Sequence, residues 1–361
     1  MKSIRPKDSL RDGPGVRTLI FVLLSILLAG CAGPGGKHLS AMNVTGESLV
    51  LAGTTPANLT FDGILKGSVK MRRGYDSGES FAEGTDFVVD YEHGTIRRTE
   101  ASRIPDYTSY PLFGLKDFDH SKFKDFSNTK WFVWVDYRTR HGAPWAEPNH
   151  QFKSMSRVRR KLEAGGPFKI LSYGDSITAG GDASRPDLRF QRRYAEYLQR
   201  KFPRAQISVE DVSIPGYTSQ QGLDWFDKKV GPVSKPDLVL VGFGMNDHNR
   251  VEVGGNEPAK FKTNLVAIAC RIQAEKGADL ILFSTFPPNE NWKFGSHRMA
   301  QYAEATRAAA QAADCAYVDV FSVWKKILTR KDQSSLLANN INHPNDFGHW
   351  LYEQAFEAMQ F

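Results

Sequence analysis

The sequence is poor in cysteine, with only three among 361 residues, and this excludes a fold held together by disulfides. It has no uninterrupted apolar run of the roughly 18–20 residues that a membrane-spanning helix needs. The formal charge is +7, but the basic residues form no arm or stripe of the kind that binds nucleic acid. The nine histidines do not stand at metal-ligand spacings, so no metal site is predicted. With 41% apolar and 24% charged residues, the composition is that of a globular protein with no nucleic-acid partner.

The N-terminal segment is typical of an export signal. A basic stretch precedes the apolar run Leu19 to Leu28, which has the length of a signal-peptide core. The tetrapeptide Leu-Ala-Gly-Cys that ends at Cys31 resembles the lipobox of bacterial lipoproteins, in which the cysteine is acylated and becomes the new N-terminus. A plain signal peptide and an unprocessed anchor are the alternatives. We expect residues 1–30 to be a lipoprotein signal peptide, residues 31–39 a Gly-rich tether, and the exported protein to be anchored to a membrane through Cys31.

Lipidation of Cys31 would leave Cys270 and Cys315 as the remaining thiols. We expect two buried, unpaired side chains, because free cysteine behaves as a small hydrophobe. A disulfide between them is the alternative, since an exported location permits one.

Residues 40–138 show the pattern of short β-strands. Apolar and polar side chains alternate over 131–137. The segments 87–91 and 95–99 flank a turn that ends in Gly94, which predicts a hairpin. We therefore expect a small all-β domain, a sandwich or a jelly roll.

Four aromatic side chains of this domain have two interpretations. They either pack in its core, the more frequent role of aromatic residues in strands, or form stacking platforms for sugar rings. They are Tyr107, Tyr110, Trp131 and Trp134.

Residues 139–166 are expected to be a linker with one short basic helix around 153–162. From residue 167 onward, apolar strand candidates alternate with helical patterns, which predicts a parallel sheet covered on both faces. The strands are expected at 168–173, 206–212, 238–243, 279–286 and 316–320, and the helices at 189–201, 220–230, 259–275, 298–313 and after Pro344. Functional sites in such sheets lie at the carboxyl ends of the strands.

Polar residues stand where this rule requires them. Ser176 follows the first strand in a Gly-Asp-Ser motif, on a tight turn that exposes its hydroxyl group. Gly216 follows the second strand, where a residue without a side chain lets its N–H approach a ligand oxygen. Asn246 follows the third strand, where its amide can face a developing oxyanion. His343 stands just before the last helix.

These four residues, in this order, resemble the SGNH branch of the GDSL esterases and lipases, and the resemblance covers residues 167–361. It implies a flavodoxin-like three-layer α/β/α sandwich and a serine esterase. Ser176 would be the nucleophile and His343 its base. The N–H groups of Ser176 and Gly216 and the amide of Asn246 would form the oxyanion hole, with no metal and no cofactor.

The chain departs from the family pattern at one position. The family usually has an aspartate three residues before the histidine, and this chain has Asn340. We expect the amide oxygen of Asn340 to orient His343, as asparagine does in papain-like enzymes. A backbone carbonyl in its place, or a slow or inactive enzyme, are the alternatives.

Other polar and aromatic residues near the motifs receive simpler interpretations. Asp175 and Asp247 are expected to brace their loops. His248 and His349 are alternative bases, with a surface or supporting role favoured for both. Trp292 and Phe294 either line an acyl or sugar pocket or cover the edge of the sheet.

A β-domain before an SGNH domain resembles some carbohydrate acetylesterases, so an O-acylated polysaccharide is the first substrate expected. Hydrolysis of lipids or small esters is the alternative within the same class. The alternative from another class is a weak or inactive glycan-binding or scaffolding lipoprotein, and Asn340 is the only residue that favours it.

Overall fold

The computed structural model describes residues 40–151 and 153–360. The expected signal peptide, the tether and the lipidation site at Cys31 lie outside these residues. Among the helices of the described part, none combines the length and the apolar character needed to cross a membrane.

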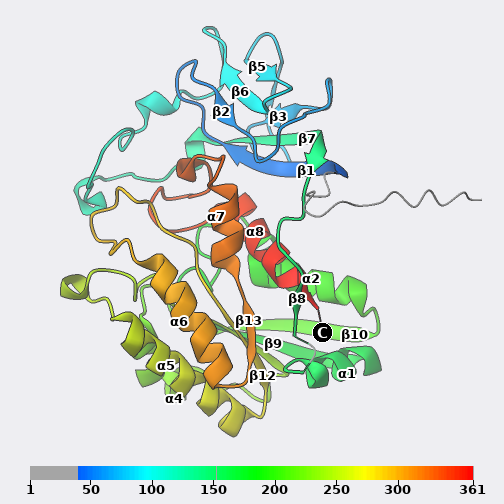
Figure 1. Ribbon diagram of the computed structural model, residues 1–361, viewed down its shortest axis with the longest axis vertical. Helices are drawn as coiled ribbons and strands as arrows, with labels where there is room; N and C mark the ends of the chain where they lie inside the picture. Colours follow the sequence, from blue (N-terminus) through cyan, green and yellow to red (C-terminus); the bar gives the residue numbers. More distant parts are fainter. Residues whose placement is uncertain (1–39, 152, 361) are drawn as a thin grey trace, which may run out of the picture. The chain divides into compact units, whose positions relative to one another are not determined.

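A five-stranded parallel sheet forms the centre of the α/β region, residues 166–360 (Figure 1). Its strands are β9 (Gly166–Gly174), β10 (Ala205–Asp211), β11 (Leu238–Gly242), β12 (Asp279–Phe283) and β13 (Ala316–Val318). They lie in the order β10-β9-β11-β12-β13, which is the flavodoxin-like order 2-1-3-4-5. Every residue of β11 is buried, which explains why this strand reads as a continuous apolar run. The five predicted strands are confirmed, although β12 ends earlier than predicted.

Helices cover both faces of the sheet (Figure 1). On one face α2 (Phe190–Lys201) packs against α8 (Asp346–Glu357), and on the other α5 (Pro258–Arg271) packs against α6 (Met299–Ala312). The remaining helices are α3 (Ser219–Asp224), α4 (Phe226–Lys229), α7 (Val320–Ile327) and a π-helical turn, Ile272–Lys276, that continues α5. The three-layer α/β/α architecture is therefore confirmed. The helix predicted over 220–230 is divided at Trp225, and α7 was not predicted.

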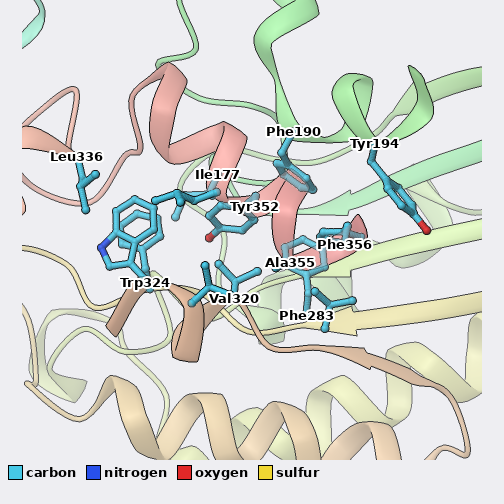
Figure 2. Close-up of a cluster of buried hydrophobic side chains, with 14 of the residues drawn as sticks. Ile177, Phe190, Tyr194, Phe283, Val320, Trp324, Leu336, Tyr352, Ala355 and Phe356 are labelled. Carbon is cyan, nitrogen blue, oxygen red and sulfur yellow. The ribbon is translucent and has the colours of Figure 1, made fainter. Parts of the chain in front are cut away.

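An aromatic cluster fixes α8 on the sheet (Figure 2). The ring of Phe190 on α2 lies 5.0 Å from that of Tyr352 on α8, and the ring of Phe283 on β12 lies 5.3 Å from that of Phe356. Burial of such rings stabilises a fold by roughly 2–3 kcal/mol each. Because His343 stands just before α8, this packing also fixes the position of the chain that carries His343.

The N-terminal β-rich region, residues 40–138, contains two antiparallel sheets. One has the order β1-β7-β3-β4 and the other β2-β6-β5. Their strands are β1 (Ser40–Leu49), β2 (Ala57–Asn58), β3 (Lys70–Arg72), β4 (Ser80–Phe81), β5 (Phe87–Asp90), β6 (Thr95–Arg98) and β7 (Val133–Gly142). The predicted hairpin is β5–β6, and Gly94 in its turn has φ +63°, a conformation that glycine adopts without strain. The small all-β region that was predicted is confirmed.

The aromatic side chains of this region pack mainly in its core. Tyr107, Tyr110 and Trp134 are buried, and Trp131 is half-buried. The rings of Tyr107 and Tyr110 stack with their centroids 4.9 Å apart. These contacts favour the packing interpretation for Tyr107, Tyr110 and Trp134.

The two remaining cysteines are both free. Cys315 is half-buried, and burial raises the pKa of its thiol to about 12. Cys270 is exposed, because it lies on the solvent side of α5, so the expectation that it is buried was wrong.

The β-rich region and the α/β region share one compact unit and one hydrophobic core. Residues 139–166, predicted to be a linker, contain β8 (Asn149–His150), which pairs with the C-terminal β14 (Met359–Gln360), and α1 (Ser156–Ala164). Glu47 on β1 and Lys331 after α7 form an ion pair at 2.7 Å with both side chains fully buried. Removing one partner of such a pair typically costs about 3–5 kcal/mol because the other charge stays buried and unpaired, so a fold with one of these side chains needs the other.

Candidate active site

Ser176 lies on a tight loop at the carboxyl end of β9, an interior strand of the sheet between β10 and β11. Gly174 before it pairs with Gly242 of β11, and a Cβ atom at Gly174 would lie 2.0 Å from the Gly242 oxygen. Only glycine fits at this close approach. Thr178 then donates its hydroxyl to the same oxygen at 2.6 Å. The loop is thereby held against the sheet edge, with Ser176 8% exposed.

A chain of hydrogen bonds joins Ser176, His343 and Asp182. The distance from Ser176 Oγ to His343 Nε2 is 2.8 Å, and the distance from His343 Nδ1 to Asp182 Oδ2 is 3.0 Å. A carboxylate can only accept, so Nδ1 carries the proton and Nε2 is free to accept the proton of the serine hydroxyl. This arrangement of nucleophile, base and acid is that of a serine hydrolase triad.

The side chain of Asn339 holds the loop that carries His343 and precedes α8. The Asn339 Oδ1 accepts the backbone N–H groups of Ile341, Asn342 and His343 at 2.9–3.0 Å. Asn345 then caps α8 by accepting the N–H of Gly348 at 3.0 Å. A short polar loop of this kind satisfies its own backbone groups and fixes the direction of the imidazole.

Asn340 does not orient His343, and that expectation was wrong. Its backbone has φ +54°, in the left-handed region, and its side chain bonds to residues other than His343. Its Oδ1 faces the Nδ2 atoms of Asn289 and Asn128 at 3.3 and 3.4 Å, and its carbonyl oxygen accepts from Asn289 at 2.8 Å. Asn340 therefore supports the loop from behind, and the backbone-carbonyl alternative does not apply either, because Asp182 occupies the position beside Nδ1.

Asp182 lies six residues after Ser176, on the same loop. Its φ of +62° lies in the left-handed region, which aspartate tolerates better than most residues. Burial raises the pKa of the Asp182 carboxyl, but the hydrogen bond and charge of His343 outweigh burial and hold the pKa below its ordinary value. Asp182 is therefore ionised wherever His343 can act as a base.

The segment after Asp182 is fastened to the start of α8. Both the backbone N–H and the hydroxyl of Ser184 donate to the buried carboxylate of Asp346, each at 2.8 Å. Since Asp346 stands three residues after His343, this contact connects the two chain segments that must bring Asp182 and His343 together.

Three N–H donors without a partner in the described part of the chain accompany Ser176. The backbone N–H groups of Ser176 and Gly216 make no hydrogen bond with any described residue. Gly216 has φ +81° and open space where a side chain would be. Asn246 gives one amide hydrogen to the Tyr217 oxygen at 2.9 Å, which leaves the other available. Free donors at strand ends suit the binding of an oxyanion.

Asp175 and Asp247 brace the loops, as predicted. Asp175 accepts the N–H of Ile177 at 3.0 Å and that of Met245 at 3.4 Å, so it joins the Ser176 loop to the Asn246 loop. Burial raises the pKa of Asp175 to about 7, against the effect of these donors. Asp247 accepts the N–H and hydroxyl of Ser219 at 2.9 and 2.6 Å, which joins the Asn246 loop to the start of α3.

The alternative bases lie away from Ser176. His349 donates Nε2–H to the Gly181 oxygen at 3.0 Å, and His248 contacts the Met245 oxygen through Nδ1 at 3.4 Å. Burial lowers the pKa of each to about 4, so both are neutral, supporting side chains. Among the described residues, no cluster of histidine, cysteine and acidic side chains could hold a metal ion.

The segment with Trp292 and Phe294 covers the junction between the two regions. Trp292 is buried and donates its Nε1–H to His120 of the β-rich region at 3.0 Å. The ring of Phe294 lies 5.7 Å from that of His120. For Trp292, these contacts favour a role in covering the junction over a role in a substrate pocket.

Sequence reasoning missed Asp182. Its only signals were a carboxylate within the nucleophile loop and the preceding pair Gly180 and Gly181, which indicate a turn. Neither signal gives the direction of the side chain, which depends on contacts with α8.

A family model and several solved structures are similar to parts of this chain. The model of the GDSL-like lipase/acylhydrolase family matches residues 172–351. A two-domain esterase active on acetylated mannans is similar over 57% of this chain and 52% of its own, about half its length, with 19% identity and a TM-score of 0.46. An acetylxylan esterase from Geobacillus stearothermophilus is similar over 54% of this chain and 94% of its own, with 23% identity and a TM-score of 0.44. No curated protein matches the sequence significantly.

Proposed function

Because residues 172–351 belong to the GDSL-like lipase and acylhydrolase family, a family of carboxylic ester hydrolases, we propose that Ser176 is the nucleophile of a serine esterase. The observation that carries this proposal is the hydrogen-bond chain from Ser176 through His343 to Asp182. His343 takes the hydroxyl proton on Nε2 as Ser176 Oγ attacks the ester carbonyl carbon. Asp182 stabilises the imidazolium that forms and keeps the ring in the required tautomer.

The three free N–H donors complete the cycle. The N–H groups of Ser176 and Gly216 and the amide of Asn246 bind the negative oxygen of the tetrahedral intermediate. Each such donor is typically worth about 3 kcal/mol in the transition state. His343 then protonates the leaving alcohol, which leaves an acyl group on Ser176. Water, deprotonated by His343, attacks this acyl group and releases the acid, which regenerates the serine.

We propose that the ester is an O-acyl group, foremost acetyl, on a carbohydrate. The β-rich region that precedes the catalytic residues, an arrangement that resembles some carbohydrate acetylesterases, supports this substrate class. A cavity of about 540 Å³ lies between the β-rich and α/β regions; Asn340 lines it, whereas Ser176, His343 and Asp182 do not. Amide side chains and exposed apolar groups, the partners that sugar hydroxyls and ring faces prefer, also line it: Asn58, Asn289, Asn291, Phe113 and Leu115.

Acetate release from acetylated polysaccharides tests the substrate class. The purified chain should hydrolyse p-nitrophenyl acetate faster than the butyrate or octanoate ester, and should release acetate from acetylated xylan or mannan. Chemically deacetylated glycan is the control. Preference for the octanoate ester with no acetate from any glycan would instead indicate a lipase. No hydrolysis of any ester would refute the esterase itself.

An inactive glycan-binding protein is a weaker candidate than it was on sequence alone. Its only support was the absence of an aspartate at position 340, and Asp182 supplies the carboxylate that Asn340 does not. The remaining features of the site all suit catalysis.

We also propose that the protein is exported and anchored to a membrane through lipid on Cys31. The proposal rests on the apolar run that ends at Leu28 and on the tetrapeptide that ends at Cys31. Cys31→Ser should abolish incorporation of radiolabelled palmitate and move the protein from the membrane to the soluble fraction, with Cys270→Ser as the matched control. Unchanged labelling of Cys31→Ser would show that the lipobox interpretation is wrong.

A further inference from the structure

Asn128 is a fully buried residue of the β-rich region, and the hydrogen bonds that it donates all go to the loop that carries His343. Its backbone N–H donates to the Ala338 oxygen at 2.6 Å. Its Nδ2 donates to the oxygens of Ser334 and Leu337 at 3.0 and 2.9 Å. Its Oδ1 accepts the hydroxyl of Tyr107 at 3.0 Å, which fixes the plane of the amide.

The residue that Asn128 holds is itself bonded to His343. Ala338 accepts the Asn128 N–H on its carbonyl oxygen and donates its own N–H to the His343 oxygen at 2.9 Å. The next residue, Asn339, supplies the oxygen that accepts the His343 N–H at 3.0 Å. A shift of the Leu337–Ala338 backbone therefore moves the backbone of His343 directly.

We propose that Asn128 is a positioning residue of the esterase, so that the β-rich region is part of the scaffold that aligns His343 between Ser176 and Asp182. This inference rests on the proposed function. Asn128 acts only through the 334–343 loop and touches none of the reacting atoms. A misplacement of a catalytic group by about 1 Å can cost roughly 100-fold in rate, so a loosened loop should be visible in turnover.

Two other contacts between the regions serve as matched controls. Glu47 accepts hydrogen bonds from Lys331, Tyr137 and the backbone N–H of Thr60, and its side chain has no hydrogen bond to residues 334–343. Asp76 pairs with Arg185 at 2.7 Å, but both side chains are about half exposed, so solvent screens the pair. Glu47→Gln should therefore destabilise the junction without moving His343, and Asp76→Ala should have little effect.

The test uses the full chain with p-nitrophenyl acetate, well below the thermal midpoint of each variant. Asn128→Ala, and Asn128→Asp with the same shape but no side-chain donors, should lower kcat about 10- to 100-fold with KM changed less than about threefold. The acid limb of the kcat/KM profile should move to lower pH, because a looser contact with Asp182 stabilises the protonated imidazole less. Tyr107→Phe removes the hydrogen bond to the Asn128 amide and keeps the stacked ring. It should lower kcat and move the acid limb in the same directions, by smaller amounts.

The low-field proton resonance of the His343 Nδ1–H, assigned with ¹⁵N-labelled histidine, gives a readout independent of activity. It should shift or broaden in the Asn128 variants and persist in Glu47→Gln. An unmoved acid limb and an unchanged resonance in the Asn128 variants would overturn the inference, even if those variants are less stable. Absence of ester hydrolysis by the unmodified chain would count against the proposed function, while the resonance would still decide whether Asn128 positions His343.

Discussion

Replacing Ser176 with alanine is expected to lower kcat for p-nitrophenyl acetate by about 10⁴-fold or more, because loss of a triad member leaves only transition-state binding. The Ser176 hydroxyl makes one hydrogen bond, to His343 Nε2, and contributes little to the core. The free energy of unfolding should therefore change by no more than about 1 kcal/mol. Thermal unfolding and initial rates measured on the same preparations check both parts.

Ser172→Ala is the matched control for this substitution. Ser172 lies on β9, is fully buried, and its hydroxyl has no partner in the described part of the chain, so its loss should leave turnover unchanged. A fluorophosphonate should label the unmodified chain and Ser172→Ala but not Ser176→Ala. Full activity of Ser176→Ala would show that the nucleophile is elsewhere.

The sheet and the positions of the motifs could be predicted because both depend on local pattern. Parallel strands buried on both faces appear as short apolar runs, as β11 does over Leu238–Gly242. Three motifs stood at the carboxyl ends of predicted strands, where sites lie, and the resemblance to the SGNH esterases identified Ser176, Gly216 and Asn246 within them. His343 stood out because it precedes the last amphipathic segment. None of these inferences needed knowledge of contacts between distant residues.

The third member of the triad could not be predicted because side-chain direction depends on distant contacts. Asn340 turns toward Asn128 and Asn289, which are 212 and 51 residues away in sequence, and its φ of +54° has no signal in the pattern. Asp182 reaches His343 from 161 residues away. The buried junction between the two regions was missed for the same reason, since Glu47 and Lys331 are 284 residues apart.

The substitution Asp182→Asn is expected to lower kcat by about 10³- to 10⁴-fold, close to the effect of the equivalent change in serine proteases. An amide can accept the Nδ1–H of His343, but it supplies no charge to stabilise the imidazolium, and its NH₂ group favours the wrong tautomer. The acid limb of the pH–rate profile should also move to lower pH, because loss of a neighbouring negative charge makes the imidazole harder to protonate.

The pH dependence of stability should change with the same substitution. The pKa of Asp182 lies below its ordinary value in the folded protein, so the carboxylate stabilises the fold above about pH 4, and this contribution is lost as the pH falls through the folded pKa. The difference in thermal midpoint between the unmodified chain and Asp182→Asn should therefore shrink toward acid pH. The comparison is best made in low salt, because the Asp182 side chain is 43% exposed and solvent screens its charge.

Asn340→Ala separates Asp182 from the residue that the family pattern would select. The Asn340 side chain contacts Asn128 and Asn289 and not His343, so its loss should weaken the loop but leave the Asp182–His343 contact in place. We expect a fall in kcat at least tenfold smaller than that of Asp182→Asn, and a smaller shift of the acid limb. If Asn340→Ala moves the acid limb and Asp182→Asn does not, Asn340 and not Asp182 controls the pKa of His343. The assignment of Asp182 to the triad would then be wrong.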